Sequence, residues 1–292
     1  MAGKITNGFV TFLRFLRPGV GLPVSFLSIT GYVLFSGKFD YKVWLCAIAI
    51  FLLSGTASIL NQVMEKNYDA RMDRTMNRPV ASGKISVLHA CIFALLMFII
   101  GFIMLFVLST VSAFLGLITI IWYLLVYTLL KRITSIAVIP GALTGALVPI
   151  IGWSVAGGLY YTPLILFISG FVFIWQVPHF WLLLLIYGKE YEEVGFPTLF
   201  NHFSPSQVRR WTVVWIMAAC ITALLLPVFN LIKNPVNIKV VLISNMVLII
   251  ASVLILLKAS NRFTYRILFY AINLFMLFIL AALVIDKLYG IQ

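Results

Sequence analysis

Six of the eight acidic residues lie in two short stretches, one beginning at residue 65 and one at residue 190. In the first stretch Asn61, Glu65 and Asp69 are spaced by four, so a helix would place them in one stripe on one face. Two carboxylates and an amide offer oxygen ligands for Mg²⁺, which prefers one or two carboxylates together with substrate phosphates. Arg74 and Arg78, which are also four apart, follow the stripe and can hold phosphate oxygens. The pattern predicts a magnesium-dependent site for a diphosphate; the alternative is a solvated helix end with ordinary ion pairs.

The second acidic stretch contains Glu190, Glu192 and Glu193. Glu190, directly after Lys189, is the candidate for a second metal-binding position. Glu192 and Glu193 are more typical of a solvated run.

Polar residues also occur inside the apolar segment that precedes this stretch. Gln176 and His179 are three apart, with Pro178 between them, and this spacing on one helix face predicts a polar cavity. The alternative is that both side chains pair with each other or with backbone.

Two adjacent cations, Lys131 and Arg132, end another apolar run. Such a pair is the usual stop signal of a cytoplasmic loop, and it is also suited to hold a diphosphate.

Composition decides where this chemistry takes place. The chain has 292 residues, of which 63% are hydrophobic and 10% are charged, with a mean hydropathy of +1.10. Soluble domains are only about 45–50% apolar and about 25% charged. A soluble enzyme, a nucleic-acid binder and a disordered chain are therefore excluded, and an integral membrane protein remains. The net charge of +13 is explained by basic residues in cytoplasmic loops and by residues that bind anionic ligands. The three cysteines lie far apart without metal or redox spacing.

Long apolar runs predict an all-α bundle of nine transmembrane helices in a single domain over residues 1–292. The predicted spans are 19–36, 43–63, 87–107, 110–130, 136–156, 163–187, 211–232, 238–258 and 265–285.

The basic residues predict the orientation of this bundle. Sixteen of the 21 Lys and Arg residues fall on the side that carries the N-terminus, which predicts a cytoplasmic N-terminus and an external C-terminus. No cleavable signal or transit peptide is recognisable, which favours a prokaryotic plasma membrane.

The order of these motifs resembles one family. The first string is Asn61, Glu65, Asp69, Met72-x-Arg74-Thr75-x-x-Arg78-Pro79 and Ser82-Gly83-Lys84. It resembles the first signature of the UbiA-type intramembrane aromatic prenyltransferases, and Lys131-Arg132 sits where these have a cationic loop. The strings around Gly145, Pro149 and Trp153, and from Trp175 to Trp181, resemble the protohaem IX farnesyltransferase (haem O synthase) branch.

The resemblance implies a nine-helix bundle around a lipid-open cavity, capped by the two acidic loops. The implied reaction transfers farnesyl from farnesyl diphosphate to a vinyl group of haem B, with water supplying a hydroxyl. It assigns catalysis and Mg²⁺ to Asn61, Glu65, Asp69 and Glu190, and diphosphate to Arg74, Arg78, Lys131, Arg132 and Lys189. Aromatic faces can hold the allylic cation that remains, at about 0.5–2 kcal/mol each.

On the acceptor side the resemblance implies five residues: Trp153, Trp175, Gln176, His179 and Trp181. His179 would ligate haem iron or orient the acceptor, unless it is a structural histidine. A downstream haem A synthase is a further partner in this interpretation, alongside the lipid bilayer.

Two departures from the family pattern stand out. The second acidic motif is reduced to Lys189-Glu190-Tyr191, and Asp73 lies outside the metal pattern. The rival functions are a quinone-pathway prenyltransferase, an ion-coupled transporter and a structural assembly factor. A transporter is disfavoured because the carboxylates gather on one side instead of at the midplane, and no inverted repeat is evident.

Overall fold

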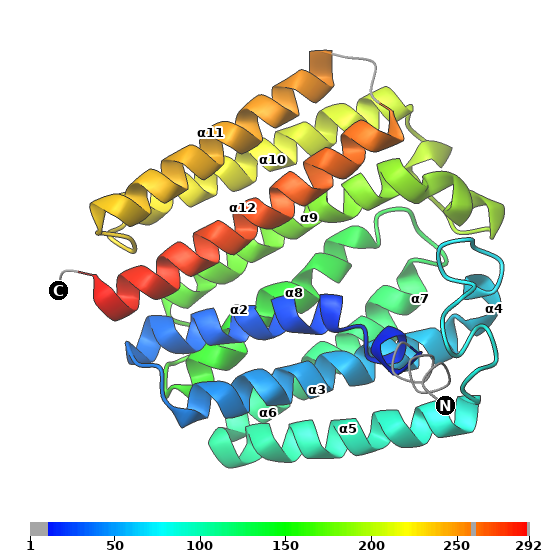
Figure 1. Cartoon of the computed structure of the whole chain (residues 1–292), viewed down its shortest axis with the longest axis horizontal. Coiled ribbons are helices and arrows are strands. Elements are labelled where there is room, and N and C mark those ends of the chain that lie inside the picture. Colours follow the sequence, from blue (N-terminus) through cyan, green and yellow to red (C-terminus); the bar gives the residue numbers. More distant parts are fainter. Residues whose placement is uncertain (1–10, 258–260, 291–292) are drawn as a thin grey trace, which may run out of the picture.

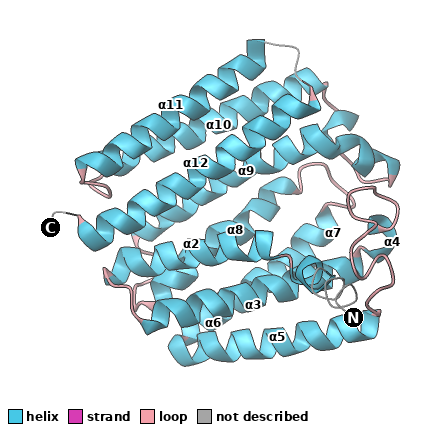
Figure 2. Cartoon of the chain, viewed as in Figure 1, coloured by secondary structure: helices cyan, strands magenta, loops and turns pink. Residues whose placement is uncertain are grey.

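The computed structural model describes residues 11–257 and 261–290, and the regular structure of this part is helical throughout (Figures 1 and 2). It contains nine helical segments that are long and apolar enough to cross a membrane, as predicted. The elements are α2 (Pro18–Ser36), α3 (Tyr41–Met64), α4 (Lys66–Asp69), α5 (Val87–Leu108), α6 (Thr110–Ile121), the π-helix η1 (Trp122–Tyr127), α7 (Thr128–Leu130), α8 (Val138–Val155), α9 (Pro163–Glu193), the 3₁₀-helix η2 (Leu199–Asn201), α10 (Pro205–Val228), α11 (Pro235–Leu257) and α12 (Arg262–Tyr289).

The predicted spans differ from the helices mainly where a helix continues past the apolar run. Helix α9 continues from its predicted end at 187 to Glu193. Helix α10 begins at Pro205, well before the predicted 211, because Ser204 and Gln207 form a capping box. Hydrophobicity alone does not reveal such ends. The predicted end of the eighth span, residue 258, lies outside the described residues.

Four helices form a closed ring, in which α2 packs on α8, α8 on α9, α9 on α12 and α12 on α2. Helix α3 packs on α2, and α6 packs on α8. Helices α5, α10 and α11 lie outside this ring (Figure 1). The arrangement leaves room for a central cavity between α2, α3, α6, α8, α9 and α12.

Buried hydroxyl groups connect neighbouring helices within the bundle. Ser25 donates to the carbonyl of Ala47 at 3.0 Å, and Ser112 donates to that of Ile151 at 3.1 Å. Interhelical hydrogen bonds of this kind average about 0.6 kcal/mol in membrane proteins. They add specificity to packing that otherwise depends on close contact.

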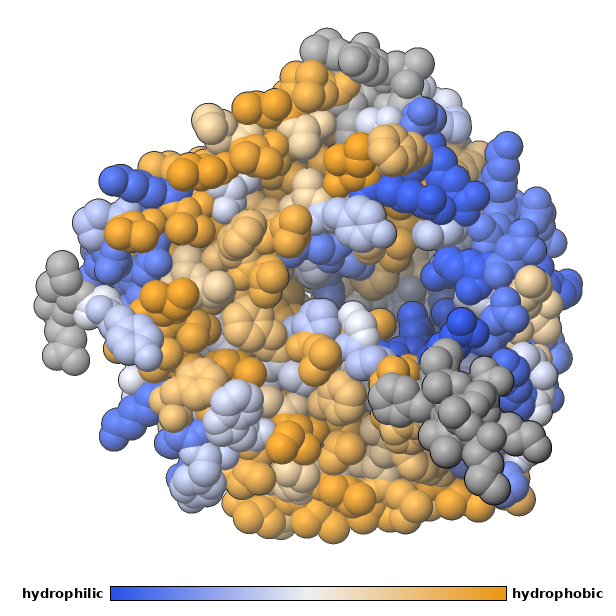
Figure 3. All heavy atoms as spheres, viewed as in Figure 1, coloured by the Kyte–Doolittle hydropathy of each residue, from blue (hydrophilic) through white to orange (hydrophobic). Residues whose placement is uncertain are grey.

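Polar side chains gather at one end of the bundle, where α3 passes into α4 and α9 ends (Figure 3). We call this the polar end. The outer faces of the helices are apolar; Val107 and Leu88, for example, are 79% and 67% exposed. This distribution is the one expected of a bundle surrounded by lipid.

Glycines allow α2 and α8 to cross in direct contact. A Cβ atom at Gly31 would overlap the carbonyl oxygen of Pro149, and one at Gly152 would overlap that of Ser28. The two glycines therefore fix the distance between the backbones of these helices.

We predict that Gly152→Ala destabilises the bundle by about 1–3 kcal/mol, because a rigid carbonyl must move to admit the methyl group. The matched control is Gly170→Ala in α9, where an added Cβ meets nothing within 4 Å. Thermal melting in detergent should show a lower transition temperature for the first variant alone. Equal melting of both variants would refute this role of Gly152.

Candidate active site

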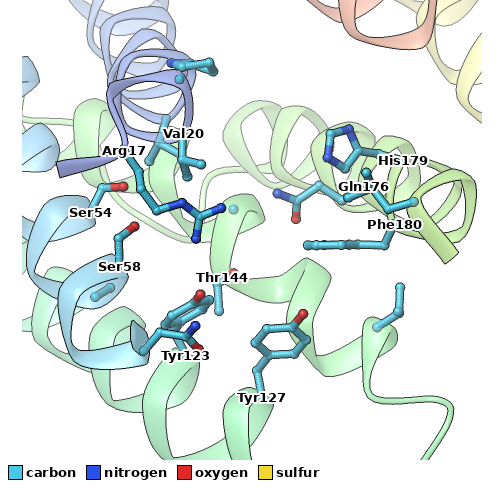
Figure 4. Close-up of a pocket in the computed structure, with 18 of the residues that line it drawn as sticks. Arg17, Val20, Ser54, Ser58, Tyr123, Tyr127, Thr144, Gln176, His179 and Phe180 are labelled. Atoms are coloured by element: carbon cyan, nitrogen blue, oxygen red, sulfur yellow. The ribbon is translucent and has the colours of Figure 1, made fainter. Parts of the chain in front are cut away.

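A cavity of about 1050 Å³ begins at the polar end and continues between the helices of the ring. One wall carries the predicted acidic stripe, and the facing wall of α9 carries Gln176 and His179. Figure 4 shows Arg17 reaching into this space from the start of α2, opposite Gln176. Exposed apolar residues of α2 and α12, including Leu22 and Leu274, also line the cavity, so it has an apolar flank that faces lipid.

The predicted stripe forms as the four-residue spacing requires. Helix α3 ends at Met64 and α4 begins at Lys66, yet the backbone hydrogen bonds continue through the junction. Glu65 N donates to the Asn61 carbonyl at 2.9 Å, and Asp69 N donates to the Glu65 carbonyl at 2.8 Å. All three side chains are buried and line the cavity. Asn61 Nδ2 donates to Glu65 Oε2 at 2.9 Å, so these two side chains of the stripe are directly linked.

Each carboxylate of the stripe has its own cation. Lys131 Nζ lies 2.6 Å from Glu65 Oε1. Arg78 Nη1 donates to Asp69 Oδ1 at 2.8 Å and to Oδ2 at 2.7 Å. Burial raises the pKa of Asp69, and the Arg78 guanidinium opposes this shift without cancelling it. Burial likewise lowers the pKa of Lys131, against the effect of Glu65. Two of the cations predicted to bind diphosphate, Lys131 and Arg78, are therefore the counter-ions of two acids predicted to bind metal.

Arg74 joins the cavity from the loop after α4. Its Nη2 donates to the Tyr191 hydroxyl at 2.8 Å, and its guanidinium lies 4.9 Å from the centre of the Tyr187 ring. It lines the cavity together with Tyr191. Two of the predicted phosphate-binding arginines, Arg74 and Arg78, are thus brought to the acidic stripe by a loop, since the helix itself ends at Asp69.

Glu190 lies at the rim of the cavity and is not part of its lining. Its Oε1 accepts from Arg262 at 3.1 Å, and its Oε2 accepts from the backbone of Arg74 at 3.4 Å. Its predicted role in metal binding stays a prediction. The neighbouring Lys189 is exposed and does not line the cavity.

Lys131 and Arg132, the adjacent cations at the end of α7, point in different directions. Lys131 lines the cavity, whereas Arg132 donates to the carbonyl of Met64 at 2.9 Å and lies over the Tyr68 ring. Arg132 therefore holds the end of α3, outside the cavity lining.

Two of the predicted acceptor-side residues, Gln176 and His179, face the cavity, and each has a polar atom without a hydrogen bond to the described part of the chain. Gln176 Oε1 and His179 Nδ1 are buried without a hydrogen-bond partner among the described residues. Trp175 also lines the cavity, and its Nε1 donates to the carbonyl of Ile272 at 2.8 Å. Unpaired buried polar atoms are costly, so their position at a cavity points to a ligand or water.

The structure places the other two predicted tryptophans away from the cavity. Trp153 donates to the carbonyl of Leu159 and packs on Phe35. Trp181 packs edge-on against Trp215. Neither lines the cavity, so the sequence pattern grouped residues that the fold separates.

Among the cavity residues that have no predicted role from the sequence are Arg17, Tyr123 and Tyr127. In the sequence, Arg17 is only one of the basic residues that predict the orientation of the bundle. Tyr127 and Tyr123 lie four and eight residues before Lys131. This repeated spacing of four is the feature of the sequence that indicates them.

The donor set fits magnesium that arrives with a phosphate ligand. The described residues contain no group of three or more His, Cys, Asp or Glu side chains placed to hold a metal by themselves. They do offer two carboxylates and an amide in one stripe, with cations beside them. Mg²⁺ commonly takes one or two carboxylates and completes its shell with substrate phosphates and water.

The comparison with known proteins agrees with this geometry. The model of the UbiA prenyltransferase family matches residues 24–279. The chain belongs to the UbiA prenyltransferase family. It is 34% identical over 223 residues to the protoheme IX farnesyltransferase of Geobacter sulfurreducens, which covers 75% of this chain and 81% of that protein. It is 33% identical over 266 residues to that of Oleidesulfovibrio alaskensis, covering 91% and 92%.

Solved structures of the family share the fold of this family member. A UbiA homologue from Archaeoglobus fulgidus bound to GPP and Mg²⁺ matches with a TM-score of 0.67 and 15% identity, over 94% of this chain and 99% of that one. A homologue from Aeropyrum pernix matches with a TM-score of 0.75 and 16% identity, over 91% and 97%. The predicted all-α intramembrane prenyltransferase fold is therefore confirmed.

We predict that Asp69→Asn lowers prenyl transfer by about 100-fold or more, because the charge that attracts a metal is lost while the size is kept. The matched control is Asp73→Asn, an exposed carboxylate outside the cavity, which should change the rate by less than about twofold. Turnover is measured at saturating Mg²⁺, with a melting curve to show that both variants fold. Near-normal turnover of Asp69→Asn would remove this residue from the ligand set.

Proposed function

We propose that this chain is a protohaem IX farnesyltransferase, which transfers farnesyl from farnesyl diphosphate to a vinyl group of haem B and forms haem O. The observation that carries the proposal is one cavity with two chemically different walls. Metal ligands and cations lie at its polar end, and Gln176 and His179 lie on the facing wall of α9. The names of the relatives support the same acceptor.

Asn61, Glu65 and Asp69 would hold Mg²⁺ on the diphosphate, since their side-chain oxygens lie in one stripe of the cavity wall. The metal would neutralise charge on the leaving group. A homologue of the same fold from Archaeoglobus fulgidus binds GPP together with Mg²⁺, which supports a prenyl diphosphate and a metal as joint ligands. Glu190 is a further proposed ligand, and it would have to leave Arg262 to reach the cavity.

The cations of the site act on the leaving group. When the bond between C1 of farnesyl and the diphosphate oxygen breaks, the electron pair stays on that oxygen. Lys131, Arg74 and Arg78 line the same end of the cavity and would stabilise the developing charge. Glu65 and Asp69 already hold Lys131 and Arg78 at the cavity wall, and these two cations would exchange that pairing for the diphosphate when it binds.

The allylic cation that remains is soft and carries its charge over carbon. Tyr127, Trp175 and Phe180 line the cavity and present aromatic faces that attract a cation within about 6 Å. The apolar walls limit the access of water, which must reach the product only where the hydroxyl group forms. Gln176 Oε1 and His179 Nδ1 are free to orient that water or the haem.

The placement in the cell is part of the proposal. We infer a prokaryotic plasma membrane as the location. We infer further that the polar end and the N-terminus face the cytoplasm, because 16 of the 21 basic residues lie on that side. Two of these sixteen, Lys4 and Lys258, lie outside the described residues. A reporter that is active only in the cytoplasm should be silent when fused after residue 290. A haem A synthase that consumes the product is the proposed downstream partner.

Purified protein with Mg²⁺, farnesyl diphosphate and haem B tests the function directly. Chromatography should reveal a more hydrophobic haem whose mass has increased by one farnesyl group and one hydroxyl group, since water adds as hydroxyl and releases its other proton. Transfer to a quinone precursor but not to haem B would overturn the proposal and assign the chain to the quinone pathway.

We predict that His179→Ala raises the KM for haem B by about tenfold, while binding of farnesyl diphosphate changes by less than about twofold. The reason is that His179 lies on the wall facing the acidic stripe. The matched control is His202→Ala, an exposed histidine outside the cavity. Binding of each substrate is measured separately, alongside a melting curve. A parallel loss of both affinities and of thermal stability would make His179 a structural residue.

A further inference from the structure

A second cavity of about 560 Å³ adjoins the first at the polar end. Its wall carries four arginines and two neutral polar residues: Arg14, Arg17, Arg74, Arg78, Thr75 and Asn77. None of the described residues that line it is acidic. A concentration of guanidinium groups of this kind calls for a multiply charged anion.

The two cavities share part of their walls. Arg17, Arg74 and Arg78 line both of them, whereas Arg14 and Asn77 line the second cavity alone. Arg14, Arg74 and Asn77 are exposed to solvent. The second cavity therefore connects the catalytic cavity to the water at the polar end of the bundle.

Arg17 stands between the two cavities in an unusual backbone conformation. Its φ and ψ of 52° and 58° are in the left-handed region, which is unfavourable for a residue with a side chain. From this position its guanidinium points into the catalytic cavity (Figure 4). Burial lowers the pKa of Arg17, and the neighbouring Arg78 and Arg74 lower it further. Strain and charge repulsion at one residue are typical of a site that is relieved by a ligand.

The chemistry of the reaction supplies a matching anion. This step rests on the proposed function, because prenyl transfer releases inorganic diphosphate inside the bundle. The flank that faces lipid is apolar, with Leu22 62% exposed and Leu274 51% exposed. A polyanion cannot leave by that side, since charged groups in the hydrocarbon region are costly. The arginine-lined cavity offers the alternative.

We propose that the second cavity is a separate anion site that receives inorganic diphosphate from the catalytic cavity and passes it to water at the polar end. Arg17, Arg74 and Arg78 contact the anion on both sides of the passage, and Arg14 holds it on the outer side. A single carboxylate is less suited, because Asp69 offsets only Arg78 and the other three guanidinium groups exceed the charge of one carboxylate.

Binding of inorganic diphosphate in EDTA tests the site without metal and without turnover. Calorimetry on the purified full chain should show binding that Arg14→Gln and Asn77→Asp each weaken by about threefold to fivefold. Both residues lie outside the catalytic cavity, so Mg²⁺-dependent binding of farnesyl diphosphate should stay within about twofold. The matched control is Arg210→Gln, an exposed arginine that lines neither cavity.

Three results would overturn the proposal: no binding of diphosphate in EDTA, an equal loss with Arg210→Gln, or tighter binding of glutarate than of diphosphate. The last would assign the site to carboxylates. A chain that does not farnesylate haem B, yet binds diphosphate in a manner that depends on Arg14, would refute the proposed function and support this site.

Discussion

Pairing of buried charges is the constraint on which the rest of the site depends. An unpaired carboxylate at the edge of a bilayer is expensive, and removal of one partner from a buried pair typically costs about 3–5 kcal/mol. Glu65 and Asp69 can lie in the cavity wall because Lys131 and Arg78 meet them there. The acidic stripe therefore depends on the loop directly after α4, which supplies Arg78, and on the end of α7, which is distant in the sequence and supplies Lys131. A diphosphate with magnesium would satisfy the same four charges by exchange of partners.

The glycines of α2 and α8 help to position the charged residues of the cavity, although they do not contact them. Direct contact of the two backbones at Gly31 and Gly152 holds one side of the ring closed. Helix α12 closes the ring on the other side of α2. The start of α2 is where Arg17 enters the cavity, so its position follows from this packing. The close packing of α2 on α8 therefore also determines how far Arg17 lies from the acidic stripe.

The sequence predicted what periodicity and charge control, and missed what the loops and the backbone control. The spans and the stripe of Asn61, Glu65 and Asp69 follow from spacing, and the structure contains them. Arg132 and Trp181 were grouped with the site because their neighbours in the sequence belong to it. Only the fold shows that a helix end or a helix face turns them away. Arg17 could not be predicted, because its direction depends on a left-handed residue that has no sequence signal.

The π-helix η1 explains how one segment places three side chains on a single wall. Tyr123, Tyr127 and Lys131 are four residues apart, and all line the cavity. In a regular α-helix each four-residue step rotates about 40° beyond a full turn, so the third side chain would point about 80° away from the first. The wider turn of a π-helix rotates less per residue and offsets this drift. Lys131 therefore reaches Glu65 while both tyrosine rings still face the cavity, and the counter-ion and the aromatic wall depend on the same local irregularity.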